Sequence, residues 1–115
     1  MTKWILALAA MMAVSGVSAS TVRAAEIKEW TFMVYLNGDN NLDPYGTIDM
    51  GEMARVGSDA NVNIVVLRDT PELTVSSKIY FIEKGNQVVV KDYGRNIDMG
   101  DWHNVVEFYK FVQAN

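Results

Sequence analysis

The chain has 115 residues, half of them apolar, and a formal net charge of −4 at pH 7, with acidic and basic residues scattered along it. This composition is that of one small globular domain at most, and the absence of a basic cluster argues against a nucleic-acid partner or an anionic membrane surface. The chain has no cysteine, which excludes disulfide bonds, a lipid-modified cysteine and a thiol nucleophile or metal ligand from these residues.

The N-terminal residues have the three parts of a secretory signal peptide in the expected order. Lys3 supplies the basic residue, and residues 4–14 form an apolar run that is too short for a membrane-spanning helix, which needs about 20 residues. Small residues allow cleavage after Ala19 or after Ala24. We favour the first site, so we expect a signal peptide over residues 1–19, a polar lead-in over residues 20–29, and export.

Strand, helix and strand follow in the next part of the chain. Residues 30–36 are nearly all apolar and predict a strand that is buried on both faces. The Asn- and Gly-rich residues 37–41 favour a turn and a helix start. A helix over residues 42–56 would bury an arc made of Leu42, Tyr45, Met53 and Val56. Residues 62–67 predict a second buried strand, so the unit is a right-handed βαβ with parallel strands.

A β-hairpin and a final helix are predicted for the rest of the chain. Residues 78–83 and 87–91 have the pattern of two strands joined by a short turn. Asp101 is a good N-cap for a helix over residues 102–114, whose buried stripe would be Trp102, Val105, Tyr109 and Val112. In α/β folds another parallel strand follows such a helix, so we expect one incomplete α/β unit.

The loop over residues 37–43 is the best candidate for a ligand site, because α/β sheets bind ligands beyond the carboxyl ends of their strands. It does not fit a calcium loop, since Pro44 stands where glycine is needed and Met50 where the bidentate glutamate belongs. It also lacks the Lys-Ser/Thr pair of a phosphate loop. A helix cap with a tight turn is the alternative to a ligand role.

Four further polar residues are expected to have structural roles and no part in catalysis. Asp49 falls within the apolar arc of the first helix and should be part-buried, with donors from Arg68 or the Asn37 loop. His103 is the only histidine, and we expect it to be exposed in the first helical turn, where the helix dipole disfavours its charged form. Arg68 and Asp69 would form a surface ion pair of little value. The sequence assigns no catalytic or metal-binding residue.

Several blocks together resemble the opening of a clostripain-like cysteine peptidase. They are residues 30–42, 49–53, 56–58, 61–67 and 96–101, and the resemblance runs over residues 30–115. It implies a caspase-like α/β sandwich and a His/Cys dyad that cleaves after Arg or Lys. In that family the histidine follows the next strand and the cysteine lies further on, so both positions fall outside this chain. His103 does not match the family's histidine motif.

The resemblance implies that residues 30–115 are the N-terminal part of the peptidase domain, truncated before the catalytic residues. The two parallel strands would form the sheet centre, and Asp39 and Asn40 would lie at the edge of the substrate groove. We therefore expect an inactive scaffold from a secreted or periplasmic endopeptidase.

The expected partners are a protein or peptide substrate with Arg or Lys and the remainder of the polypeptide, but no nucleic acid and, once the signal is removed, no membrane. No cofactor is evident, and calcium in the full-length protein is left open. The alternative is a secreted, non-enzymatic α/β binding module.

Overall fold

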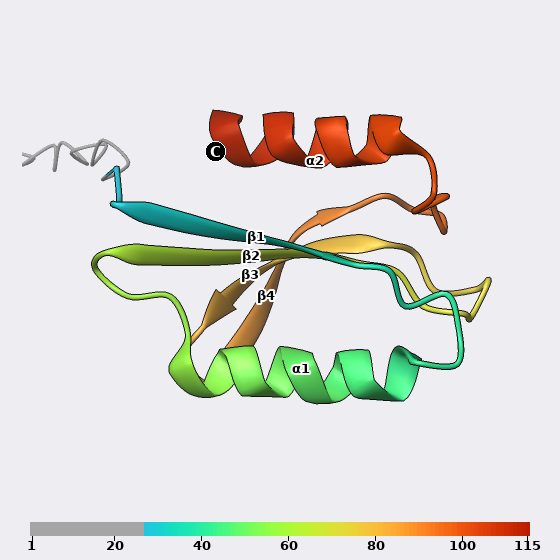
Figure 1. Ribbon diagram of the computed structural model, residues 1–115, viewed down its shortest axis with the longest axis horizontal. Coiled ribbons are helices and arrows are strands. Elements are labelled where there is room, and N and C mark those ends of the chain that lie inside the picture. The colour runs from blue at the N-terminus through green and yellow to red at the C-terminus, as the bar shows by residue number, and fades with distance from the viewer. Residues whose placement is uncertain (1–26) are drawn as a thin grey trace, which may run out of the picture.

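The computed structural model describes residues 27–115, so the predicted signal peptide lies outside the described residues (Figure 1). Six elements follow in chain order: β1 (Trp30–Leu36), α1 (Asp43–Val56), β2 (Val62–Arg68), β3 (Lys78–Glu83), β4 (Asn86–Asp92) and α2 (Trp102–Ala114). This order confirms the predicted βαβ unit, hairpin and terminal helix. Neither helix in this part of the chain is long and apolar enough to cross a membrane.

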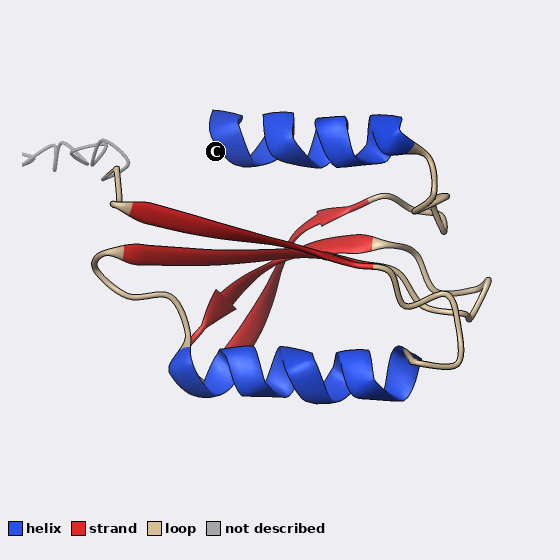
Figure 2. Ribbon diagram, in the orientation of Figure 1, coloured by secondary structure: helices blue, strands red, loops and turns tan. Residues whose placement is uncertain are grey.

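The four strands form one sheet in the order β1-β2-β3-β4. β1 and β2 are parallel, in register from Trp30 opposite Val62 to Leu36 opposite Arg68. β3 runs antiparallel to β2, and β4 antiparallel to β3. α1 covers one face of the sheet and α2 the other (Figure 2). Because successive side chains of a strand point to opposite faces, each buried strand supplies side chains to both layers.

Two separate cores result. The core under α2 contains Val65, Leu67, Ile79 and Phe108, together with Ile97 and Met99 of the segment before the helix. The core under α1 contains Met50, Ala54, Val66 and Ile82. Alternate residues of β2 thus pack in different layers, as expected for a buried strand. The prediction that residues 30–36 are buried on both faces is wrong for β1, because β1 is an outer strand of this sheet and its first three residues are exposed. Of the two parallel strands expected at the sheet centre, only β2 is an inner strand.

The predicted buried arc of α1 is wrong. Leu42, Tyr45 and Val56 are each more than half exposed, and only Met53 of that arc packs against the core. The residues that face the sheet are Gly46, Met50 and Ala54, spaced four apart. A Cβ at Gly46 would already touch the Leu36 side chain at 3.4 Å. The small residues Gly46 and Ala54 let the helix approach the sheet closely, and Met50 between them fills the space under the helix.

Asp49 is exposed, so the prediction that it is part-buried is also wrong. The cause is the same rotation of α1, which turns the predicted arc away from the sheet. Asp49 instead borders an open hollow beside Leu36 and Tyr45.

The buried face of α2 is only partly as predicted. Asp101 is the N-cap, and its carboxylate accepts the backbone N–H of His103 at 3.0 Å. Phe108 is the buried residue of the helix, with Phe111 and Val112 partly buried, whereas Trp102, Val105 and Tyr109 are exposed. Tyr109 lines a hollow together with Thr31 and Met33 of β1. The exposed apolar side of α2 thus borders β1, where the sheet ends.

Candidate functional site

The carboxyl ends of β1 and β2, the loop over residues 37–43 and the start of α2 lie at one end of the molecule (Figure 1). In open α/β sheets this is the end at which ligands bind. The loop therefore has the position that the sequence analysis gave it. Its conformation is set by two neighbouring residues at the end of β2, Arg68 and Asp69, which act on different parts of the loop.

Asp69 is 1% exposed and binds the loop backbone. Its Oδ1 accepts the N–H of Gly38 at an N···O distance of 2.6 Å, and the N–H of Asp39 lies close enough to favour the charged carboxylate. Gly38 lies so close to β2 that a Cβ there would be 2.6 Å from the Asp69 carbonyl oxygen. Burial raises the pKa of Asp69, while the two backbone N–H groups act in the opposite direction.

Arg68 makes a separate set of contacts, so the predicted Arg68–Asp69 ion pair is wrong. Its guanidinium donates to Asp43 Oδ1 at 2.7 Å and to Thr47 Oγ1 at 2.8 Å. Successive residues of a strand point to opposite faces, so Arg68 reaches α1 and Asp69 cannot follow it. Arg68 thereby fastens the first turn of α1 to β2, in a part-buried pair that is shielded from solvent better than a surface bridge.

Asn40, one of the two predicted groove residues, closes the turn. Its side-chain amide donates to the Asn37 carbonyl at 3.0 Å, and its Oδ1 accepts the N–H of Leu42 at 2.8 Å. These bonds form a tight turn before α1, as the alternative to a ligand role predicts, but no side chain caps the helix, whose N-cap residue is Leu42. Asp39 has an exposed side chain. Both residues lie at the carboxyl edge of the sheet, and their role in a substrate groove stays a prediction.

His103 is exposed, as expected, and has an acidic partner. Its Nδ1 lies 2.6 Å from Asp101 Oδ1, and its ring stacks on Trp102 with the centroids 3.7 Å apart. The hydrogen bond from the His103 side chain, followed by that from its backbone N–H, lowers the pKa of Asp101. A carboxylate at the N-terminus of a helix is itself stabilised by the helix dipole. Among residues 27–115 no serine hydroxyl hydrogen-bonds to His103, so the described structure shows no nucleophile for the pair to activate.

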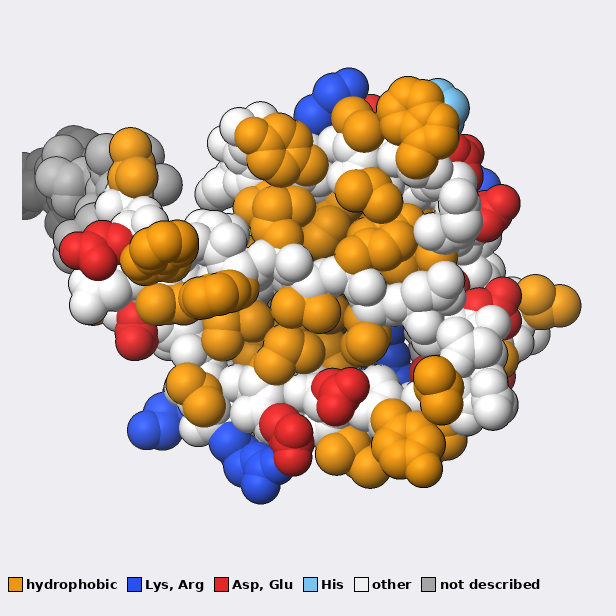
Figure 3. Space-filling view, viewed as in Figure 1, with side chains coloured by type: hydrophobic (Ala, Val, Ile, Leu, Met, Phe, Trp, Pro, Cys, Tyr) orange, Lys and Arg blue, Asp and Glu red, His pale blue; other side chains and the backbone are white. Residues whose placement is uncertain are grey.

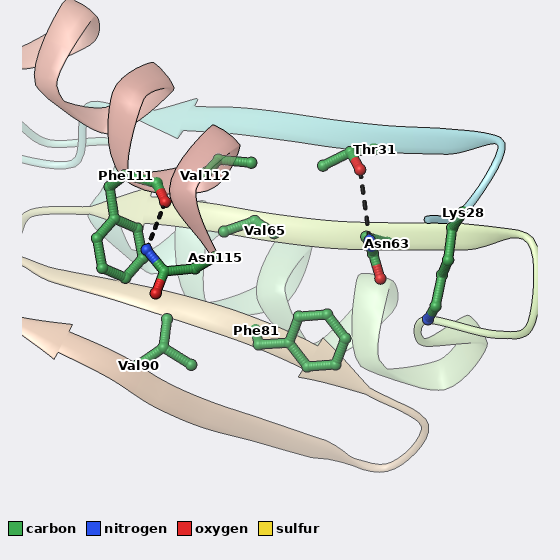
Figure 4. Close-up of a pocket in the computed structure, with 9 residues that line it drawn as sticks. All are labelled: Lys28, Thr31, Asn63, Val65, Phe81, Val90, Phe111, Val112 and Asn115. Carbon is green, nitrogen blue, oxygen red and sulfur yellow. Dashed lines mark hydrogen bonds between the residues drawn. The ribbon is translucent and has the colours of Figure 1, made fainter. Parts of the chain in front are cut away.

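Two other observations bear on ligands. Within residues 27–115 no group of three or more histidine, aspartate or glutamate side chains could hold a metal ion. A hollow of about 470 Å³ lies on the α2 face, between the end of that helix and β1, β2 and the hairpin (Figure 4). Its lining includes Lys28, Phe81 and Phe111. It lies at the amino ends of the parallel strands, away from the loop, and is largely uncovered sheet surface.

Comparison with protein families gives one match. The model of the clostripain family of C11 peptidases matches residues 34–115, which is most of the chain and nearly all of the described part. No curated protein matches the chain.

Solved structures with the same fold are cysteine proteases. A Bacteroides fragilis cysteine protease has a TM-score of 0.61 and 19% identity over 76% of this chain and 79% of that chain. A secreted C11 cysteine protease from Bacteroides thetaiotaomicron, bound to an irreversible peptide inhibitor, has a TM-score of 0.61 and 23% identity, over 73% of this chain and 25% of that chain. An inactive zymogen C11 protease from Parabacteroides distasonis has a TM-score of 0.63 and 18% identity, over 79% of this chain and 28% of that chain.

These similarities establish the fold. The chain has the α/β architecture of the C11 proteases, which is the partial caspase-like sandwich that the sequence predicts. It spans only about a quarter of the length of two of the three solved proteases.

Proposed function

Because the chain belongs to the clostripain family of cysteine peptidases, we propose that it is the N-terminal part of an exported endopeptidase that cleaves after Arg or Lys. The family match begins in β1 and continues to residue 115, and the share of two solved relatives that the chain covers supports a part and not a whole. A cysteine peptidase needs a thiolate, and this chain has no cysteine. We therefore also propose that this chain by itself is a structural part of the peptidase domain and has no peptidase activity.

The observation that carries the proposal is that β1 exposes large apolar side chains at an open edge of the sheet. It is an outer strand of the sheet, yet Trp30 is 65% and Phe32 57% exposed. Hydrophobic side chains gather along β1 and between it and both helices (Figure 3). Strands of this composition belong inside parallel sheets that are covered on both faces. α2 runs opposite to β1 in direction (Figure 1), so a right-handed crossover through α2 would bring a further parallel strand to this edge.

The finer parts of the proposal have separate support. Export rests on the signal-peptide pattern of residues 1–19, and one solved relative is described as secreted. A peptide substrate is supported by the peptide inhibitor bound to that relative, and the Arg or Lys preference by the family resemblance. The placing of Asp39 and Asn40 at the groove edge is supported by their position at the carboxyl end of β1.

The test begins with the genomic sequence around the coding region. We expect the reading frame beyond Asn115 to encode a further strand followed by a histidine-glycine segment and, later, a cysteine. The longer protein should hydrolyse peptide amides after Arg and Lys in a thiol-dependent manner, and the 115-residue chain should not. A stop codon after Asn115 in intact genomic sequence, or no hydrolysis by the longer protein, would contradict the proposal.

A further inference from the structure

Asp69 is a buried carboxylate that the proposed chemistry does not use. It and Ser77 are the two buried polar residues of the described chain. Ser77 has an evident packing role, because its hydroxyl accepts the N–H of Ile97 at 3.0 Å. None of the ion pairs between described residues includes Asp69, because the neighbouring Arg68 turns to the other face and binds Asp43. Asp69 is thus a buried acid whose visible hydrogen-bond partner is a backbone N–H group.

Such an arrangement is costly unless the hydrogen bonds are good ones. A carboxylate removed from water without a cation loses much of its solvation energy, and an apolar residue at the same place often gives a more stable protein. The hydrogen bond that Asp69 accepts comes from the backbone N–H of Gly38, in the loop after β1. A hydrogen bond from N–H to a carboxylate is shorter and stronger than one to a neutral acceptor, in keeping with the 2.6 Å separation.

The loop is built around this bond. Gly38 is buried, and the space for a side chain at this position is occupied by the Asp69 carbonyl and the Asp43 carboxylate. The Asp69 N–H donates back to the Leu36 carbonyl at 3.4 Å, which joins the two strand ends. Residue 38 is thereby fixed by Asp69, residue 40 by its own turn, and residue 43 by Arg68. Asp69 holds the part of the loop that precedes the candidate groove residues.

We propose that Asp69 is a positioning residue for substrate binding: its carboxylate holds the backbone N–H of Gly38, so that Asp39 and Asn40 keep one position at the edge of the groove. The role in substrate binding rests on the proposed peptidase function. The anchoring of the loop does not, and it can be measured on this chain alone.

The first experiment is hydrogen–deuterium exchange with mass spectrometry at neutral pH. In D69A we expect exchange of the amides of residues 37–42 to rise about tenfold, since a hydrogen bond to a charged group is lost. D69N keeps a neutral acceptor and should give a smaller rise. The matched control is D98A, because Asp98 accepts the Gly100 N–H at 2.8 Å but is exposed. It should alter only its own turn.

Exchange in D69A that matches wild type over residues 37–42, or that rises equally in the β3–β4 hairpin, overturns the anchoring. The anchoring is also overturned if the amides of residues 37–42 are unprotected from exchange in the wild-type chain.

The second experiment uses the longer peptidase with an Arg-amide substrate. We expect D69A to raise KM about tenfold with kcat within about twofold, as for a group that affects binding more than chemistry, whereas D98A changes neither constant. An unchanged KM in a D69A enzyme whose loop exchanges faster overturns the role in substrate binding. Absence of hydrolysis by the wild-type enzyme instead contradicts the proposed function, and the exchange data still decide the anchoring.

Discussion

The two outer strands of the sheet differ in the way they meet solvent. β4 carries the polar residues Asn86, Gln87, Lys91 and Asp92, and its pairing with β3 is interrupted by an irregularity at Ile79/Tyr80. Charges and bulges are the usual means by which a sheet edge avoids pairing with other chains. β1 has no charged residue and an uninterrupted register with β2. The comparison indicates that β4 is a true edge, whereas β1 has the features of an interior strand.

The backbone of β1 shows which groups a further strand would bind. The Trp30 N–H donates to the Asn61 carbonyl at 3.0 Å, and the Leu36 carbonyl accepts from Asp69. Residues of a strand alternate in the side to which their N–H and C=O groups point. Even-numbered residues of β1 therefore face β2, and the N–H and C=O groups of Thr31, Met33 and Tyr35 point to the open edge.

α1 is also attached to the β4 side. The Gly85 N–H of the hairpin turn donates to the Ala54 carbonyl at 2.7 Å, and the Ser58 N–H donates to the Ile82 carbonyl at 2.8 Å. Gly57, between them, has a φ of 72°, and a Cβ there would lie 2.2 Å from the Lys84 nitrogen.

We expect the largest effect from G57A, which tests the attachment at the β4 side. The substitution combines an unfavourable φ with a backbone clash, so it should lower the free energy of unfolding by about 3 kcal/mol or more. Denaturant unfolding of the chain measures it. G85A is the control, because Gly85 also has positive φ but open space around its Cβ position. Equal losses for the two variants would show that the close approach to the hairpin contributes nothing.

The next prediction compares the two edges directly in the longer peptidase. M33P removes an N–H that points to the open edge of β1 and should lower the free energy of unfolding by about 3 kcal/mol, as for proline inside a sheet. Q87P on β4 removes an N–H that donates to the Asn86 side chain at 2.9 Å, and we expect a smaller loss because proline is tolerated on edge strands. Denaturant unfolding midpoints of M33P and Q87P measure the two losses of stability. A loss for M33P no larger than for Q87P would mean that β1 is an edge strand after all.

A smaller effect is expected from F32T in the 115-residue chain. Phe32 is exposed here, so removing it should reduce self-association with little change in the unfolding midpoint. In the longer peptidase the same change should lower the free energy of unfolding by about 1.5–3 kcal/mol, because the side chain would then be buried. Sedimentation velocity and denaturant unfolding measure the two quantities. V90T, on β4, should have little effect in either protein, and a similar response to F32T and V90T would remove the distinction between the strands.

The smallest effect is a difference in pH dependence between Asp69 and Asp92. The pKa of Asp69 is raised, so its folded form binds a proton more tightly than its unfolded form, and its contribution to stability is lost as pH rises through the folded pKa. Hydrogen bonds from Ser76 and then from the Gly94 backbone lower the pKa of Asp92, so its contribution is lost as pH falls through the folded pKa.

We therefore expect D69N to gain stability relative to wild type between acid and neutral pH, and D92N to lose stability over the same interval. Urea midpoints measured from acid to neutral pH give both signs. A D69N curve that runs parallel to wild type would show that the carboxylate is not desolvated as described.

The sequence predicted the elements but not the helix faces. Apolar runs and turn residues were enough to place six elements in order, and Asp101 identified the start of α2. Periodicity ranked Leu42, Tyr45 and Trp102 as buried because they are large and apolar. Which side of a helix is covered depends on where the sheet lies, and α1 lies close to it through Gly46. The sequence of the helix alone does not show which of its sides will face the sheet.

The candidate site was predicted by position and missed in detail. The loop at the end of β1 follows from the rule for α/β sheets. Asp69 was read as a partner of Arg68 because the two are adjacent, yet its partner Gly38 is 31 positions away. The signal in the sequence was an aspartate directly after β2 and a glycine two residues after β1, because the carboxyl ends of parallel strands meet at the same end of the sheet.

The open edge of β1 also has a consequence for synthesis. β1 leaves the ribosome before every other described element, but its first strand partner begins at Val62, and the partner that we propose for its other side comes later still. The hairpin of β3 and β4 needs only neighbouring residues and can form quickly. We therefore expect β1 to be made before the other described strands and to be fully paired last, so that β1 would need a folding chaperone most.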